Sequence, residues 1–335
     1  MPGPPSDAEL HEVLRTALPV AGFAAPQLIR RRPSEYRTSF PLEELELKLE
    51  DGSEPRLAFK RLEWDALTDE ARLAKPEFLH DPRREPAVYA ELLASAASGA
   101  PSYYGSVIEP EAGRHWLFIE WVEGRELYQV GERELWEEAA RWLARFHLAM
   151  APQLDRHRRE GRLIDHDAGF YRRWIERASE FAARSGDESA AAVAWLRERH
   201  EPVVEALLAL PRTVLHGEFY ASNVLVAADF DHPPPVTESD VRVAPVDWEL
   251  AAAGPGLTDL AALVGGWPEA DREALVAAYA GEPGVPSFTP RALDLARLQV
   301  AIQWLGWAPP EWVPPEGQRH DWLSEAIAIA EGLGL

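Results

Sequence analysis

The chain contains no cysteine among its 335 residues. This absence excludes disulfide scaffolds, thiolate zinc sites and cysteine nucleophiles. It also removes one interpretation of His216-Gly217-Glu218, which superficially matches the His-x-Glu of zinc deaminases, because that chemistry requires a Cys-x-x-Cys partner. The sequence has no G-x-S-x-G nucleophile elbow, which argues against a Ser-His-Asp hydrolase.

Basic residues are scarce relative to acidic ones. The chain has 34 Lys and Arg against 56 Asp and Glu, which gives a formal net charge of −22. Sequence-independent binding of nucleic acid needs a surface rich in Lys and Arg, so we expect no nucleic-acid partner. The acidic excess either attracts a cationic substrate or serves only to keep the protein soluble.

Long apolar runs are also absent. No segment approaches the roughly 18 consecutive apolar residues of a membrane span. Residues 1–14 have neither the basic start nor the apolar core of a secretory signal. We therefore expect a cytoplasmic protein with no membrane partner, whose oligomeric state the sequence does not indicate.

Apolar and polar residues alternate through the first third of the chain. This period of two predicts strands, and a separate helical pattern follows the third of them. The expected strands cover 27–31, 43–52, 56–62, 103–108 and 114–124, and the expected helix covers 84–97. Asp51-Gly52 is a turn signal between the second and third strands.

From residue 132 the apolar pattern becomes mainly helical. Helices are expected over 132–150, 169–184, 188–210, 257–264, 269–280, 290–306 and 320–333, with short strands at 213–215, 223–226 and 242–246. Residues 229–240 are typical of a Pro-rich acidic turn. The pattern predicts an α+β, bilobal protein: an N-terminal β-rich lobe over 1–123, a hinge near 120–126, and a larger helical lobe over 124–335. Ligand sites often lie between two such lobes.

Three features of the first lobe suit a nucleotide. Lys60 shares a strand face with Ala58 and can contact phosphate oxygens, although an edge-strand lysine in water has the same pattern. Glu85 can hold Lys60 by an ion pair, or it is an ordinary acid at a helix N-terminus. The strand end at Glu120 and Val122 offers backbone groups for an adenine edge, or it is a plain linker.

The segment HGEFYASNVLV, residues 216–226, carries the strongest chemical pattern. Four residues separate Glu218 from Asn223, and a carboxylate base and a carboxamide metal ligand at this spacing match the kinase catalytic loop. Asp247 follows Asn223 by 24 residues, at the end of an expected strand. Oxygen ligands of this kind suit Mg²⁺, so Asn223 and Asp247 are expected to share one ion.

Taken in order, these pieces resemble the aminoglycoside phosphotransferase family, which has the protein-kinase-like fold. The matching segments follow the family's order between residues 27 and 263. They are AFK at 58–60, EPAVYAELL at 85–93, FIEWVEG at 118–124, WLARFH at 142–147, HGEFYASNVLV at 216–226 and PVDWELAAAGPGLTDLAAL at 245–263.

The resemblance implies an ATP- and Mg²⁺-dependent enzyme that transfers the γ-phosphate to a hydroxyl of a small molecule. Family members act on antibiotics or on metabolites such as choline or sugars. By resemblance, Lys60 contacts nucleotide phosphates and pairs with Glu85, and the backbone at Glu120 and Val122 holds adenine. Further along the chain, Glu218 takes the base position and Asn223 and Asp247 bind Mg²⁺. His216 has a structural role in the loop, and Asp259 braces it.

The chain departs from the family pattern at two places. The segment 32–44 has no Gly-rich phosphate loop, and Ser34 or Ser39 with neighbouring amides would have to cover the phosphates. Glu218 stands where the family has Asp. The two acids have nearly equal pKa values, so geometry is the issue: one methylene moves the carboxylate by about 1.5 Å, and a misplacement near 1 Å can cost about a hundredfold in rate. The alternative function is a pseudokinase, a nucleotide-binding or scaffold protein without transfer activity.

The acceptor is expected in the helical lobe. Trp304, Trp307, Trp312 and Trp322 fall in the tail and would either stack on a flat, sugar-like acceptor or pack in the helical core. Acidic side chains would either meet an amine of a cationic acceptor or face solvent. They are Glu176, Glu180, Asp321 and Glu325.

Overall fold

A computed structural model describes residues 4–18, 26–34, 36, 39–94, 99–228, 241–313 and 320–335. Three predicted features therefore lie outside the described residues, in whole or in part: the acidic turn at 229–240, the end of the helix over 84–97, and the tail at 314–319. The chain divides into two compact units. The first comprises Met1–Arg72 and His80–Gly124, and the second comprises Leu73–Leu79 and Arg125–Leu335. We call Leu73–Leu79 the strap.

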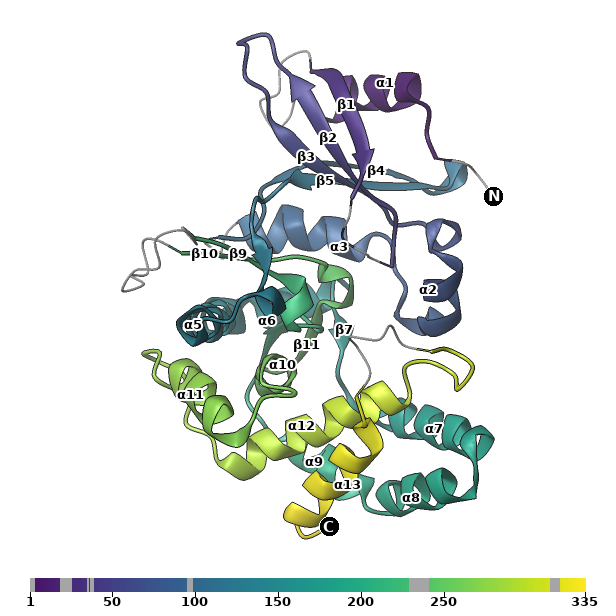
Figure 1. The fold of residues 1–335 in the computed structure, drawn as a ribbon, viewed down its shortest axis with the longest axis vertical. Coiled ribbons are helices and arrows are strands. Elements are labelled where there is room, and N and C mark those ends of the chain that lie inside the picture. The colour runs from purple at the N-terminus through teal and green to yellow at the C-terminus, as the bar shows by residue number, and fades with distance from the viewer. Residues whose placement is uncertain are drawn as a thin grey trace. The chain divides into compact units, whose positions relative to one another are not determined.

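The first unit is built on a five-stranded antiparallel sheet with the order β1-β2-β3-β5-β4 (Figure 1). All five predicted strands are confirmed, with boundaries shifted by a few residues. They are β1 (Gln27–Pro33), β2 (Leu42–Lys48), β3 (Arg56–Arg61), β4 (Tyr103–Glu109) and β5 (Arg114–Glu120).

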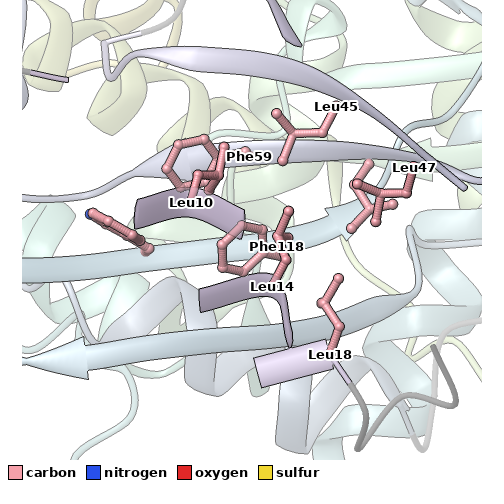
Figure 2. Packing of buried hydrophobic residues seen from close by; sticks show 9 residues of the cluster. Leu10, Leu14, Leu18, Leu45, Leu47, Phe59 and Phe118 are labelled. Carbon is pink, nitrogen blue, oxygen red and sulfur yellow. The ribbon is translucent and has the colours of Figure 1, made fainter. Parts of the chain in front are cut away.

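A helix that the sequence patterns did not predict packs on this sheet. Helix α1 (Asp7–Ala17) begins after Ser6, whose side chain accepts a hydrogen bond from the Glu9 amide at 3.2 Å. Figure 2 shows its leucines inside one apolar cluster with residues of the strands. The cluster comprises Leu10, Leu14, Leu18, Leu45, Leu47, Leu57, Phe59, Trp116 and Phe118. Because Leu57 and Phe59 face this cluster, Ala58 and Lys60 lie on the opposite face of β3, as the sequence predicts.

The helix expected over 84–97 begins as α3 (Arg84–Ala87) and continues as a π-helical segment, Val88–Leu93. Glu85 therefore stands in the first helical turn and is buried. A shorter helix, α2 (Asp69–Ala74), leads into the strap and was not predicted.

The second unit is mainly helical. Predicted helices are confirmed as α5 (Arg133–Met150), α7 (Ala168–Ser185), α10 (Leu257–Leu263), α11 (Glu269–Ala280), α12 (Pro290–Leu305) and α13 (Trp322–Gly332). Helix α6 (Leu154–Arg159) was not predicted. Helices α12 and α13 lie side by side (Figure 1).

The prediction of one continuous helix over 188–210 is wrong. The structure has two helices there, α8 (Asp187–Glu198) and α9 (His200–Leu208). The backbone leaves helical geometry at Arg199, with φ −108° and ψ 1°. Pro202 lies in the first turn of α9, where it has no amide to donate back to α8, so the break falls just before it.

Two small sheets complete the second unit. One has the order β10-β9-β6 and the other β7-β11-β8. The predicted strands are β8 (Arg212–Leu215), β9 (Val224–Ala227) and β10 (Arg242–Pro245). Three strands were missed: β6 (Arg125–Glu126), β7 (Ile164–Asp165) and β11 (Ala252–Pro255). The first two have only two residues each, and β11 is made of Ala, Gly and Pro, which have low strand propensity.

In the described part of the chain, no helix combines the length and apolar character needed to cross a membrane.

Candidate functional site

Lys60 and Glu85 form a buried ion pair in the first unit. The Lys60 Nζ lies 2.8 Å from the Glu85 Oε2, and the two side chains are 6% and 2% exposed. Lysine and glutamate are almost never buried unless paired, so each side chain fixes the position of the other. The Phe40 ring centre lies 5.6 Å from the Lys60 Nζ, and Phe40 follows half-buried Ser39 directly. The structure contains the expected pair; its contact with phosphate stays a prediction.

The segment after β5 is tied to the sheet by its side chains. The Glu120 carboxylate accepts hydrogen bonds from the Ser102 amide at 3.0 Å and the Ser102 hydroxyl at 3.1 Å. The Trp121 amide donates to the Arg56 carbonyl at 3.2 Å. Val122 is buried, and no hydrogen bond within the described residues engages its amide. That amide is therefore available as a donor to a purine edge.

In the second unit, β8 ends at a turn that accepts only glycine. Gly217 has φ +90°, and a Cβ there would lie 2.1 Å from the Leu250 carbonyl oxygen. The Asp259 carboxylate accepts hydrogen bonds from the His216 amide at 2.7 Å and the Gly217 amide at 3.0 Å. Asp259 stands in the first turn of α10, so this helix holds the turn that presents Glu218.

His216 holds the loop through both ring nitrogens. Its Nε2 lies 2.9 Å from the Val246 carbonyl oxygen, and its Nδ1 accepts a hydrogen bond from the Glu218 amide at 3.3 Å. A carbonyl can only accept and an amide can only donate, so these contacts select the neutral tautomer protonated on Nε2. His216 is fully buried, which agrees with a structural role.

Asn223 and Asp247 stand at the same end of a strand pair. β9 and β10 are antiparallel, with Val224 opposite Pro245, and the Val246 amide donates to the Asn223 carbonyl at 2.9 Å. The Asn223 Nδ2 donates to the Glu218 carbonyl at 3.0 Å, so the carboxamide oxygen is the Asn223 atom that a metal would bind. Asp247 has φ 66° and ψ 59°, a left-handed conformation that costs energy outside glycine and often marks functional sites.

These residues fit a magnesium ion that also binds phosphate. Mg²⁺ commonly takes one or two protein oxygen ligands and completes its shell with phosphate and water. The carboxamide oxygen of Asn223 and the carboxylate of Asp247 are ligands of this kind. Within the described residues no group of three or more His, Cys, Asp or Glu forms a metal site. The arrangement therefore suits a metal that arrives with a nucleotide better than a metal enclosed by protein.

An aromatic cluster packs against the residues around Glu218 and Asp247. The Trp248 ring lies 4.4 Å from the His216 ring and 5.2 Å from Phe146, and the Trp248 Nε1 donates to the Pro245 carbonyl at 3.1 Å. Trp142 stacks on Phe146 and on Phe219, with centroid distances of 5.3 and 5.9 Å. This packing fixes Phe219 and Trp248, the neighbours of Glu218 and Asp247, against α5, which carries Trp142 and Phe146.

Asp259 also closes a buried network with α5 and α11. The His147 Nε2 lies 3.2 Å from the Asp259 Oδ2, and the His147 Nδ1 lies 2.8 Å from the Tyr279 hydroxyl. Burial alone would raise the pKa of Asp259, but the hydrogen bond with His147 and the hydrogen bond from the His216 amide together hold it below its usual value. Asp259 is therefore anionic at neutral pH and keeps accepting the two loop amides.

Two features of the second unit had no predicting signal. The first is Lys75 in the strap, whose buried side chain pairs with Glu249, two residues after Asp247. The second is a cavity of about 260 Å³ whose lining includes Tyr220, Arg297, His320, Trp322 and Glu325. Of the four tail tryptophans, only Trp322 lines this cavity, and of the four proposed acids, only Glu325 does.

The remaining residues of those two sets have other contacts. Trp304 stacks on Trp322, and Trp307 stacks on Trp174. The Trp312 amide donates to the Pro309 carbonyl in a turn. Asp321 caps α13 by accepting from the Ser324 amide at 3.0 Å. Glu176 and Glu180 are exposed on α7.

Comparison with known proteins gives a family and a fold. Residues 48–296 match the sequence profile of the phosphotransferase enzyme family, and the resemblance stated from the sequence is confirmed. No match was found among the curated proteins compared by sequence.

Several solved structures share the fold over nearly the whole chain. A GDP complex of wild-type aminoglycoside 2'-phosphotransferase IIIa is 12% identical and covers 98% of each chain with a TM-score of 0.59. A macrolide 2'-phosphotransferase from Brachybacterium faecium is 17% identical, with 97% and 98% coverage and a TM-score of 0.57. A microcompartment-associated aminopropanol kinase is 14% identical, with 98% and 95% coverage and a TM-score of 0.57. The predicted kinase-like α+β fold is confirmed.

Proposed function

Because the chain belongs to the phosphotransferase enzyme family, we propose that it transfers the γ-phosphate of Mg-ATP to a hydroxyl of a small molecule. In this proposal residues 1–123 bind the nucleotide, and residues 124–335 supply the catalytic loop and the acceptor site. The observation that carries the proposal is the loop geometry of the second unit. Asp259, His216 and Asn223 hold the backbone around Glu218 by five hydrogen bonds between 2.7 and 3.3 Å.

Glu218 is the proposed base. It accepts the proton of the acceptor hydroxyl while the acceptor oxygen forms a bond to the γ-phosphorus and the bond to the ADP oxygen breaks. Asn223 and His216 both bind the Glu218 backbone, so the position of residue 218 in the loop is fixed. A fixed backbone supports the positioning of the carboxylate, and positioning is most of what phosphoryl transfer requires from a protein.

The nucleotide and its metal are assigned to residues that the sequence indicated. Lys60, held by Glu85, contacts the phosphates, with Ser39 and its neighbouring amides covering them. The Glu120 carbonyl and Val122 amide hold the purine edge, and one structural relative was solved with GDP, so a purine nucleotide is expected. Asn223 and Asp247 hold Mg²⁺, which when bound neutralises charge on the phosphates.

A pseudokinase is the second candidate. Glu218 in place of Asp and the absence of a Gly-rich loop in segment 32–44 favour it. The presence of Lys60, Asn223 and Asp247 together favours an active enzyme instead, because a chain released from catalysis has no chemical need for all three.

The metal assignment is tested with Asp247→Ala. We expect this variant to lose Mg-ATP turnover by at least about a hundredfold, because a key metal ligand is gone, while its circular dichroism stays that of the wild type. Glu188→Ala, an exposed acid on α8, is the matched control and should keep full turnover. Turnover persisting in Asp247→Ala would remove Asp247 from the metal site.

A further inference from the structure

The cavity of the second unit opens beside the proposed catalytic loop. Tyr220, two residues after Glu218, forms part of its wall. The Tyr220 amide donates to the Glu218 carbonyl at 2.7 Å, so this part of the wall belongs to the same turn as Glu218. A molecule bound in this cavity therefore contacts the loop that carries the residue proposed to take a proton.

The polar side of the cavity is already charge-compensated. The Glu325 Oε1 accepts from the Arg297 guanidinium at 3.2 Å, and the Glu325 Oε2 lies 2.5 Å from the His320 Nε2. Arg297 is also 2.9 Å from Asp294. An ammonium group that enters would have to displace Arg297 or His320 from the carboxylate, and it would face the Arg297 charge. Hydroxyl groups carry no such penalty, because they can both donate and accept.

The other walls are aromatic and small. The Trp322 ring stacks on Trp304 with centroids 5.4 Å apart and an interplanar angle of 6°, and the His320 ring packs on it at 4.4 Å. Trp304 in turn contacts Tyr220 at 5.4 Å, so the aromatic wall continues to the catalytic loop. The rest of the lining includes Ala261, Ala262, Gly265 and Gly266, which have no polar side chains.

The size of the cavity limits the acceptor further. Its volume of about 260 Å³ lies just below the roughly 300–1,000 Å³ typical of sites for drug-sized ligands. A single ring fills this space, whereas an antibiotic of several linked rings would extend out of it. The half-buried Trp322 ring supplies a flat apolar wall, and Arg297, Glu325 and His320 supply donors and acceptors in the same lining.

We propose that this cavity binds an uncharged, hydroxyl-rich single ring, such as a monosaccharide or cyclitol, against Trp322 and the Arg297–Glu325–His320 group. The proposal rests on the proposed phosphotransferase function and names its substrate class. Within the described lining, the site selects against polyamines even though the whole chain carries a net charge of −22.

The test is a calorimetric titration in the presence of Mg-ADP, with glucose and myo-inositol against glucosamine, kanamycin and choline. Glucosamine differs from glucose at one position, where an ammonium group replaces a hydroxyl, so their comparison tests the effect of that charge. We expect the uncharged ring to bind at least about tenfold more tightly than its amine partner. Trp322→Ala should weaken that binding by about tenfold or more, and Trp322→Phe, which keeps a ring, by less. Trp195→Ala, a half-buried tryptophan on α8 outside the cavity, is the control.

The outcomes separate this inference from the proposed function. Tighter binding of glucosamine, kanamycin or choline overturns the inference, and their phosphorylation with Mg-ATP in the same preparations leaves the proposed function standing. If neither set binds, the inference is also overturned, and binding of Mg-ADP alone then keeps only the nucleotide half of the function. If Trp322→Ala binds the uncharged ring as the wild type does, the ring binds elsewhere.

Discussion

At the scale of single residues, His166 makes the fold sensitive to acid. Its ring stacks on Phe170 with centroids 3.9 Å apart, and burial lowers its pKa from 6.5 to about 4. A histidine with a depressed folded pKa stays neutral in the fold while the unfolded chain takes up a proton. Stability is therefore complete above pH 6.5 and falls as the pH drops from 6.5 to about 4.

We expect His166 to remove about 3 kcal/mol of unfolding free energy across that pH interval, at about 1.4 kcal/mol per pKa unit. His166→Phe keeps a ring of similar shape and loses the titration. Urea unfolding of both proteins at pH 7 and pH 4.5 measures the difference. If the unfolding free energy changed equally between pH 7 and pH 4.5 in both proteins, His166 would not be the group responsible for the acid sensitivity.

Residues were predictable where they belong to an ordered motif and hidden where they do not. Glu218 and Asn223 lie five positions apart, so their pattern is visible in one dimension. Lys75 and Glu249 are 174 positions apart, and Arg297 and Glu325 are 28 apart. Lysine and arginine are usually exposed to solvent. The local sequence therefore does not show that Lys75 is buried or that Arg297 lines a cavity. The left-handed backbone of Asp247 is likewise set by its surroundings and has no sequence signal.

At the scale of elements, the strap is held to the second unit by a buried ion pair. The Lys75 and Glu249 side chains are 2% and 9% exposed. The Phe78 ring lies 5.5 Å from Trp174 and 4.5 Å from the Arg173 guanidinium. The strap therefore packs on the DWE segment, residues 247–249, which holds the proposed metal ligand, and on α7.

Lys75→Met should destabilise the protein by about 3–5 kcal/mol, because it leaves the Glu249 carboxylate buried without this partner. The double variant Lys75→Met with Glu249→Met should recover most of that loss, since apolar pairs of similar size replace buried ion pairs well. Chemical denaturation of the wild type, the two single variants and the double variant measures the loss of unfolding free energy in Lys75→Met and its recovery in the double variant. Arg172→Met, which breaks an exposed pair with Glu201, is the control and should cost about 1 kcal/mol or less. An equal loss in the single and double variants would show that the pair itself does not stabilise the strap.

Elements with strong periodicity were predictable, and short or covered ones were not. The pattern identified α5 and α7 and all five strands of the first sheet. Helix α1 was not predicted, because its leucines are buried only by contact with the strands of the sheet they cover. The one long helix predicted over 188–210 was split by Pro202, whose missing amide outweighs the continuous apolar pattern.

At the scale of the whole molecule, the fold and the family follow from the order of the motifs. Residues 48–296 match the family profile, and the solved relatives cover nearly the whole chain at 12–17% identity. Such distant relatives share the arrangement of elements while their acceptors differ. The cavity of this chain therefore indicates the acceptor class and the family motifs do not, because no motif contains Arg297, Glu325 or His320.

The most direct measurement is phosphoryl transfer from Mg-ATP to a panel of hydroxylated acceptors by the wild type, Glu218→Gln and Glu218→Asp. If Glu218 is the base, we expect one acceptor to stimulate wild-type turnover. Glu218→Gln should lower that turnover by about a hundredfold or more, and Glu218→Asp should also lower it, because the shorter acid moves the carboxylate by about 1.5 Å. Full turnover in Glu218→Gln, or transfer that emerges only in Glu218→Asp, would contradict the proposal that Glu218 is a working base.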